Sequence, residues 1–183
     1  MFKGFRAKKQ AKNTLADVYR VVVGQARLPA FYRDFGVPDT VDGRFDMIVL
    51  HMALCLRRLR AADADLDDQA QALFDFMFSD MDYALREMGA GDMSVGRRIR
   101  AMVEAFYGRT KTYDKALDAG DGEMLTDALA RNVFPDCKPP VAAAHRLAEY
   151  VIQAEAALAG VPVTDILAGG FGFCDPAAAL NCP

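Results

Sequence analysis

The sequence predicts an all-α protein: a single-domain, multi-helix bundle of about six to eight helices, with a central apolar helix and a long antiparallel helical hairpin. Apolar residues recur at intervals of three and four along most of the chain, which is the period of an amphipathic helix. No segment alternates apolar and polar residues between turn signals, as a half-buried strand would. The 183 residues are 52% hydrophobic, enough for one core without metal or disulfide bonds.

Turn and capping residues divide the chain into its expected helices. Asn13 and Thr14 can cap a first helix that runs toward Leu28. Pro29 suits the first turn of a short helix that ends before Gly36. We expect further helices at about residues 42–60, 66–88, 94–117, 122–133, 140–158 and 162–167.

The most apolar run, Met47 to Leu56, predicts a helix that other helices enclose. It is interrupted by His51 and is well short of the roughly 20 residues needed to cross a bilayer. His51 and His145 are the only histidines, and neither has a second histidine close by to share a metal ion. We interpret both as ordinary packed or surface side chains.

Two consecutive amphipathic segments predict the hairpin. Residues 66–88 place Met77 and Met81 on one apolar stripe at helical spacing, and residues 94–117 carry a second stripe. The sequence Gly89-Ala90-Gly91-Asp92 between them is typical of a turn. The two helices are therefore expected to run antiparallel.

Charge and composition divide the chain into a basic N-terminal arm (1–12), a helical domain (13–168) and an irregular C-terminal tail (169–183). The arm carries a charge of +5, which leaves 17 basic against 25 acidic residues, or −8, on the rest. The arm is either a solvated, disordered tail or a segment that rests on anionic lipid. Its basic and aromatic side chains are Phe2, Lys3, Phe5, Arg6, Lys8, Lys9 and Lys12. The acidic body argues against DNA as a partner, because like charges repel.

Residue types that carry catalysis or hold cofactors form no familiar pattern. The only serines, Ser79 and Ser94, lie outside any Gly-x-Ser-x-Gly sequence. No Cys-x-x-Cys pair occurs, so we expect reduced thiols in a cytoplasm, and the first residues lack the apolar stretch of a secretory signal. The cysteines are Cys55, Cys137, Cys174 and Cys182. The sequence therefore predicts no catalytic residue, no metal site and no cofactor.

The hairpin has more apolar residues than one buried face needs. Phe76 and Tyr83 lie seven residues apart, on the opposite side of their expected helix from Met77 and Met81. They form either a second packing layer or part of an exposed apolar groove that receives another protein's helix. Methionines cluster in the same hairpin, and their flexible side chains suit either a core or a surface that binds varied apolar clients.

Several motifs resemble the ubiquinol-cytochrome c chaperone family. In the hairpin they are Phe-Asp-Phe-Met-Phe-Ser-Asp-Met-Asp (74–82), Leu-Arg-Glu-Met-Gly-Ala-Gly-Asp (85–92), Val-Gly-Arg-Arg (95–98) and Glu-Ala-Phe-Tyr-Gly-Arg (104–109). Upstream, Gln-Ala-Arg-Leu-Pro-Ala-Phe-Tyr (25–32) and Pro-Asp-Thr-Val-Asp-Gly-Arg-Phe-Asp (38–46) are similar to bacterial members. The resemblance covers roughly residues 15–117.

This resemblance implies an assembly chaperone, not an enzyme, that binds newly made cytochrome b and assists its delivery into the ubiquinol-cytochrome c reductase complex. Mitochondrial relatives act at the ribosomal tunnel exit with a smaller partner protein, so the ribosome and such a partner are further candidates. A bacterial member is expected in the cytoplasm, peripheral to the inner membrane. Two other classes stay open: a permanent structural or adaptor bundle in a membrane-associated complex, and an enzyme of unrecognised type.

We therefore expect client-binding residues in the hairpin. The apolar candidates are Phe76, Phe78, Tyr83, Met88 and Met93. The charged candidates are Arg86, Glu87, Asp92, Arg97 and Arg109. These charges either form a rim that orients the client or brace the two helices internally.

Overall fold

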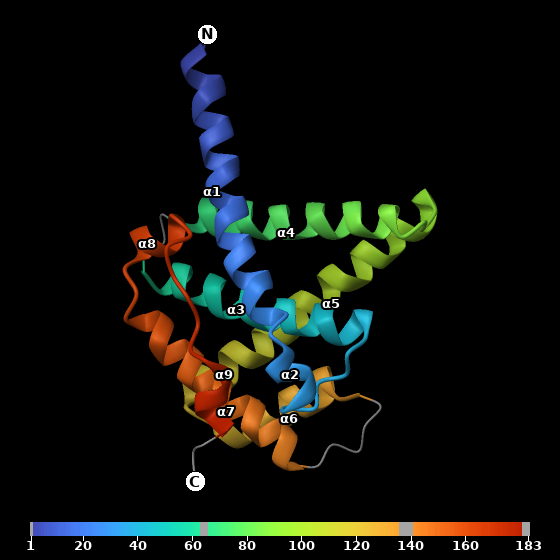
Figure 1. The fold of residues 1–183 in the computed structure, drawn as a ribbon, viewed down its shortest axis with the longest axis vertical. Helices are drawn as coiled ribbons and strands as arrows, with labels where there is room; N and C mark the ends of the chain where they lie inside the picture. The colour runs from blue at the N-terminus through green and yellow to red at the C-terminus, as the bar shows by residue number, and fades with distance from the viewer. Residues whose placement is uncertain (1, 63–65, 136–140, 181–183) are drawn as a thin grey trace.

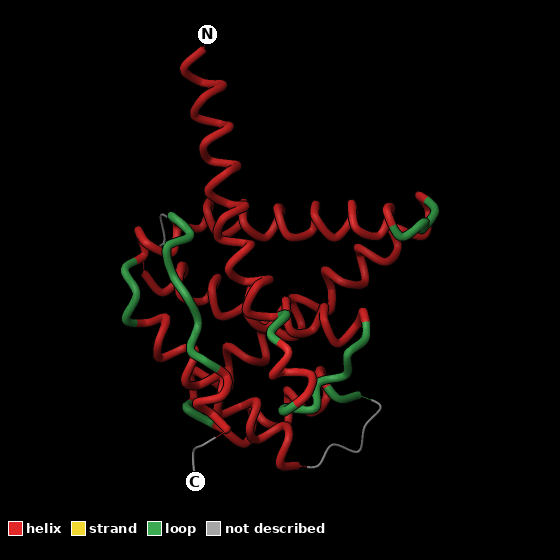
Figure 2. The backbone as a smooth tube through the Cα atoms, viewed as in Figure 1, coloured by secondary structure: helices red, strands yellow, loops and turns green. Residues whose placement is uncertain are grey.

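The computed structural model describes residues 2–62, 66–135 and 141–180, with side chains described for 14–62, 66–135 and 142–180. Within these ranges the backbone consists of helices and loops, with no strand (Figure 2). The expected all-α fold is confirmed. The side chains of the basic arm, together with Cys137 and Cys182, lie outside the described residues.

The helices follow the predicted order along the chain (Figure 1). They are α1 (Phe2–Ala26), α2 (Pro29–Arg33), α3 (Val41–Ala62), α4 (Asp67–Glu87), α5 (Asp92–Ala119), α6 (Gly122–Val133), α7 (Val141–Ala159), α8 (Val163–Leu167) and α9 (Pro176–Leu180).

Two segments differ from expectation. Helix α1 begins at Phe2 rather than near Asn13, because the residues before Asn13 are mostly Ala, Lys and Gln, which favour a helix. The C-terminal segment expected to be irregular contains α9. The Asp175 carboxylate accepts a hydrogen bond from the Ala177 amide at 2.9 Å, and Pro176 occupies the first helical position, so the helix has both a cap and a favoured start.

Helix α3 is the centre of the bundle. Every residue from 46 to 56 is buried, and the helix packs against α1, α4, α5, α6, α7 and α8. Its start is fixed by Thr40, whose hydroxyl oxygen accepts a hydrogen bond from the Gly43 amide at 3.0 Å. A Cβ at Gly43 would lie 2.1 Å from the Pro38 carbonyl oxygen, so only glycine allows the incoming loop to approach this closely.

A polar network lies inside this core. His51 Nδ1 donates to the Met47 carbonyl at 2.7 Å, so Nε2 accepts from the Tyr150 hydroxyl, also at 2.7 Å. Gln25 donates to the Tyr150 hydroxyl at 3.0 Å and to the Cys174 carbonyl at 2.9 Å. Complete burial lowers the pKa of His51 to about 4 and keeps the ring neutral. The network joins α1, α3, α7 and the C-terminal loop, and it places His51 in the core.

The hairpin of α4 and α5 projects from this core. The two helices meet at a turn on the right-hand edge of Figure 1, far from α7 and α9. Their base packs against the rest of the bundle: α4 contacts α1 and α3, and α5 contacts α3 and α6. The turn is therefore the part of the hairpin with the fewest helices around it.

Candidate functional site

Aromatic side chains fix the two helices of the hairpin against each other. The Phe74 and Phe78 rings of α4 lie 5.2 Å and 6.0 Å from the Phe106 ring of α5, between ring centroids. Such edge-to-face pairs add to the stabilisation that comes from burying the rings. The base of the hairpin is therefore a packed aromatic cluster that holds the turn in place.

Backbone geometry makes the turn tight. Gly89 has φ 82, a left-handed conformation that side-chain-bearing residues rarely adopt. Its amide donates to the Arg86 carbonyl at 2.9 Å, and the Ala90 amide donates to the Leu85 carbonyl at 3.1 Å. This is the Schellman pattern, which satisfies the last carbonyls of α4 and ends the helix. Gly91 is the N-cap residue of α5, which begins at Asp92.

Arg86 ties the end of α4 to the start of α5. Its guanidinium donates to Asp82 at 2.6 Å, one turn back on α4, and to Asp92, the first residue of α5. Asp82 and Asp92 are thus already paired within the hairpin. The Glu87 side chain forms no hydrogen bond or ion pair with another described residue and stays available as a rim charge.

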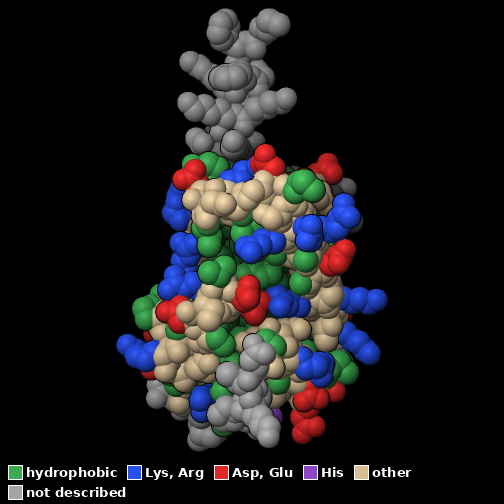
Figure 3. Space-filling model, turned by 90° about the vertical axis from the view of Figure 1, so that its right-hand side faces the viewer, with side chains coloured by type: hydrophobic (Ala, Val, Ile, Leu, Met, Phe, Trp, Pro, Cys, Tyr) green, Lys and Arg blue, Asp and Glu red, His purple; other side chains and the backbone are tan. Residues whose placement is uncertain are grey.

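Large apolar side chains are exposed around this turn. Tyr83 and Met88 are each 64% exposed, and Met93 is 86% exposed. Seen from the side of the hairpin, hydrophobic side chains gather between Lys and Arg side chains (Figure 3). We call Tyr83, Met88 and Met93 the hairpin tip. Three of the five apolar candidates are thus exposed at the turn end of the hairpin.

The other two apolar candidates lie closer to the core. Phe78 is 7% exposed because it packs on Phe106, so it is unable to contact a client and is removed from the expected set. Phe76 is half-buried, with its ring edge-on to Tyr19 of α1 at 5.5 Å. For Phe76 the structure favours the second packing layer, since α1 crosses the part of α4 that carries it.

The charged candidates divide in the same way. Arg97 is exposed on α5, one turn beyond Met93. Arg109 is instead half-buried near the base of the hairpin, where it forms an ion pair with Asp46 of α3. Arg109 therefore braces the hairpin against the core, whereas Arg97 is free to meet another molecule.

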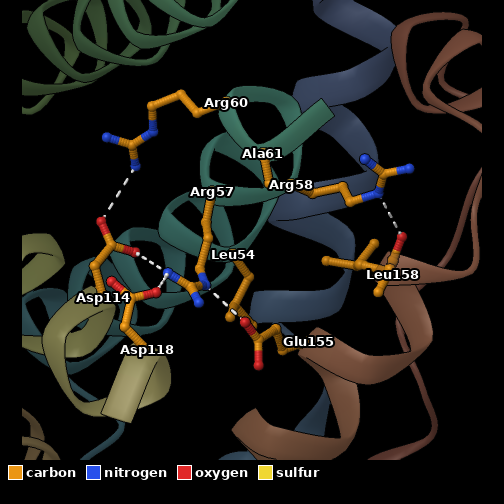
Figure 4. A pocket seen from close by; sticks show the side chains of 10 residues that line it. Leu54, Arg57, Arg58, Arg60, Ala61, Asp114, Asp118, Glu155 and Leu158 are labelled. Atoms are coloured by element: carbon orange, nitrogen blue, oxygen red, sulfur yellow. Dashed lines mark hydrogen bonds and ion pairs between the residues drawn. The ribbon is translucent and has the colours of Figure 1, made fainter. Parts of the chain in front are cut away.

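A second concentration of charge lies where α3, α5 and α7 meet. Here a pocket of about 400 Å³ is bordered by three arginines and three carboxylates (Figure 4). Arg57 contacts Asp118 at 2.7 Å and Glu155 at 2.6 Å, and Arg60 lies 3.5 Å from Asp114. Each carboxylate forms an ion pair with an arginine of α3, so the cluster links α3, α5 and α7. We call this cluster the clamp.

Three exposed residues of α5 were not among the client-binding residues predicted from the sequence. Tyr107 is 53% exposed on α5, with its ring 5.3 Å from that of Phe74. Lys111 and Lys115 are exposed further along the same helix. Positions 97, 100, 104, 107, 111 and 115 follow one another at intervals of three or four residues, and this spacing predicts one shared helix face.

Two comparisons relate this architecture to known proteins. The sequence profile described as ubiquinol-cytochrome C chaperone matches residues 33–173, which include the whole hairpin. The chain belongs to the ubiquinol-cytochrome c chaperone family. The crystal structure of the Cbp3 homolog from Brucella abortus superposes with a TM-score of 0.83 and 38% sequence identity, over 96% of this chain and 97% of that one.

Two animal proteins match this chain at lower sequence identity. The Drosophila melanogaster ubiquinol-cytochrome c reductase complex assembly factor 1 is 28% identical over 160 residues, covering 85% of this chain and 61% of the fly protein. The Xenopus laevis protein of the same name is 25% identical over 124 residues, covering 67% of this chain and 62% of the frog protein. The chain thus spans about three fifths of the length of these two relatives. In the described part of this family member, no helix is both long and apolar enough to cross a bilayer.

Proposed function

We propose that this chain is an assembly chaperone, rather than an enzyme, that binds newly made cytochrome b and assists its delivery into the ubiquinol-cytochrome c reductase complex. Family membership supports the chaperone role. The observation that carries the site is the hairpin tip: Tyr83, Met88 and Met93 are exposed at the end of a rigid, aromatically packed hairpin. A chaperone for a membrane protein needs apolar surface to cover the apolar segments of its client.

The size of the tip suits transient binding. Covering three apolar side chains of this kind contributes roughly 5 kcal/mol before the costs of association are subtracted. Nanomolar affinity needs about 12 kcal/mol, so a client held mainly by this contact is readily released. Methionine makes two of the three contacts, and its flexible, polarizable side chain adapts to segments of different shape.

Charges around the tip set the orientation of the client. Asp82 and Asp92 share one counter-charge, Arg86, whereas Glu87 and Arg97 form no ion pair within the described chain. Charges at a rim affect encounter and register more than affinity, because they remain solvated. A transmembrane segment with charged flanks would therefore be selected over a purely apolar peptide.

The test is capture of cytochrome b from detergent-solubilised membranes by the immobilised full chain. Replacing Tyr83, Met88 and Met93 by Ser should reduce the captured cytochrome b severalfold and leave the melting temperature within a few degrees of wild type, since exposed side chains contribute little to stability. The matched control is Val41→Ser with Ile152→Ser, two other exposed apolar residues outside the hairpin.

Three outcomes contradict the proposal. Undiminished capture by the folded triple variant removes the hairpin tip as the site. An equal loss in the control variant means that general surface hydrophobicity, and not this tip, is responsible. If the wild-type chain instead remains in fixed stoichiometry within the mature reductase complex, it is a structural subunit rather than a chaperone.

A further inference from the structure

One long face of α5 is exposed along nearly the whole helix. Positions 93, 97, 100, 104, 107, 111 and 115 recur at three or four residues, so they share one side of the helix. All seven residues are exposed, whereas Val95, Phe106 and Tyr113 on the opposite side are buried. We call this side the outer face of α5. It carries Met93, Arg97, Arg100, Glu104, Tyr107, Lys111 and Lys115.

The positive charges of the outer face have no intramolecular counter-charges. Arg97, Arg100, Lys111 and Lys115 form no ion pair with any residue in the described ranges. Three of the four acidic residues of α5 are paired elsewhere. Asp92 binds Arg86, Asp114 lies 3.5 Å from both Arg57 and Arg60, and Asp118 lies 2.7 Å from Arg57.

Glu104 is therefore the one acidic residue of α5 without an arginine partner in the described chain. The outer face carries an excess of positive charge, although the whole chain has a net charge of −3. At the C-terminal end of the face, Asp114 and Asp118 are bound in the clamp by Arg57 and Arg60 of α3 rather than by Lys111 or Lys115. Such a face is complementary to an anionic partner.

The shape of the face indicates which kind of anionic partner it fits. From Arg97 to Lys115 it extends roughly 27 Å at the rise of an α-helix, with cations at both ends. Tyr107 and Met93 add an amphipathic and an apolar side chain to the same line. Interfacial helices combine these residue types, because the cations meet lipid phosphates while the apolar groups enter the headgroup region.

We propose that the outer face of α5 binds the surface of an anionic phospholipid bilayer, with the helix parallel to the membrane plane. Phosphate groups of nucleic acid share the charge complementarity, but they offer no apolar layer for Met93 and Tyr107. Each surface cation contributes about fivefold to partitioning, the equivalent of about 1 kcal/mol. The outer face shares Met93 with the hairpin tip and Arg97 with its charged rim, whereas Arg100, Tyr107, Lys111 and Lys115 belong to the outer face alone.

The experiment measures co-sedimentation of the full chain with vesicles of equimolar phosphatidylcholine and phosphatidylglycerol, at low and high salt. The double variant R97Q/R100Q should partition about 25-fold more weakly than wild type, from two losses of about fivefold each. K111Q/K115Q should show a similar loss. High salt, or vesicles of phosphatidylcholine alone, should abolish the wild-type binding.

The matched control is R27Q/R131Q, which removes the same charge from two exposed arginines outside α5. Its partitioning should remain at the wild-type level, and melting curves should show that all three variants are folded. The residues 1–12 are intact throughout. Unchanged binding of R97Q/R100Q therefore overturns the proposal and assigns any lipid binding to other residues, such as those of the basic arm.

Two further results also overturn it. An equal loss in R27Q/R131Q means that net charge alone governs the binding. Binding of single-stranded RNA that requires Arg97 and Arg100, without vesicle binding, means that the face recognises nucleic acid. Cytochrome b capture is measured in detergent, where no bilayer is present, so failure of the membrane proposal and failure of the chaperone proposal are separate results.

Discussion

Arg109 on α5 and Asp46 on α3 form an ion pair of 2.5 Å, between Nη1 and Oδ1, at a position where the aspartate is only 6% exposed. The guanidinium carbon also lies 5.7 Å from the centroid of the Phe45 ring. Burial raises the pKa of Asp46 to about 6, against the opposing effect of Arg109. The pair joins the base of the hairpin to the central helix, and the burial of the Asp46 carboxylate that this requires costs free energy.

Removing each partner of this pair should have unequal effects. Arg109→Met leaves a buried carboxylate without a counter-charge, and it should lower the free energy of unfolding at pH 7 by about 3 kcal/mol or more. Asp46→Asn should cost less, because Arg109 is 19% exposed and reaches solvent more easily. Urea denaturation at pH 7 measures both values. Equal losses would show that the two charges are equally desolvated.

The same pair predicts a pH dependence. In the unfolded chain Asp46 has a pKa of about 3.8, and in the folded chain about 6. Between these values the folded state keeps a proton that the unfolded state has released, so this group stabilises the fold as the pH falls from 7 toward 4. The free energy of unfolding of the wild type, relative to that of Asp46→Asn, should therefore rise as the pH is lowered from 7 toward 4. A difference in stability between the two proteins that is constant with pH would contradict the raised pKa of Asp46.

Tyr150→Phe tests the network in the core. The substitution removes the hydroxyl that donates to His51 and accepts from Gln25, and it leaves both groups without this partner. We expect a loss of about 1–3 kcal/mol in the free energy of unfolding. Tyr83→Phe removes an exposed hydroxyl and serves as the control, with little expected change. A loss in Tyr150→Phe no larger than in the control would mean that water replaces the hydroxyl.

His51 should show a pH effect of opposite sign to that of Asp46. Its pKa falls from 6.5 in the unfolded chain to about 4 in the folded chain, so the unfolded state binds the extra proton between these values. The contribution of His51 to the free energy of unfolding is fully present above about pH 6.5, and it is lost as the pH falls toward 4. NMR titration of the folded protein should show a neutral His51 ring down to pH 5. A ring that protonates near pH 6.5 would mean that solvent reaches it.

Gly89→Ala tests the turn of the hairpin. Its φ of 82 is strained for alanine, so the substitution should lower the free energy of unfolding by about 1–2 kcal/mol. Gly96→Ala is the control, since Gly96 lies within α5 and a Cβ there meets nothing within 4 Å. That change should stabilise the protein by up to about 1 kcal/mol. Thermal melts of both variants give the comparison, and effects of the same sign would refute the turn geometry.

The sequence by itself determined most of the helical segments and which of them is central, although it missed α9 and the first residues of α1. The apolar run around His51 is hydrophobic on all sides, and a helix of that kind is stable only when other helices cover it. Glycines at 89 and 91 likewise predicted the turn, because a left-handed residue at a helix end favours glycine. These properties depend on neighbouring residues in the chain, so periodicity and local backbone preference were enough to predict them.

Only the tertiary structure decided which side chains remain exposed. Phe76, Phe78 and Tyr83 all belong to α4, and periodicity predicts the side of the helix that each occupies but not the element that covers it. Phe78 meets Phe106, Phe76 meets Tyr19 of α1, and Tyr83 extends beyond both contacts. The role of Arg109 depends in the same way on Asp46, which is 63 residues earlier in the chain. Contacts between residues so far apart depend on how whole helices pack. The spacing of residues within one helix does not predict which other helix will cover them.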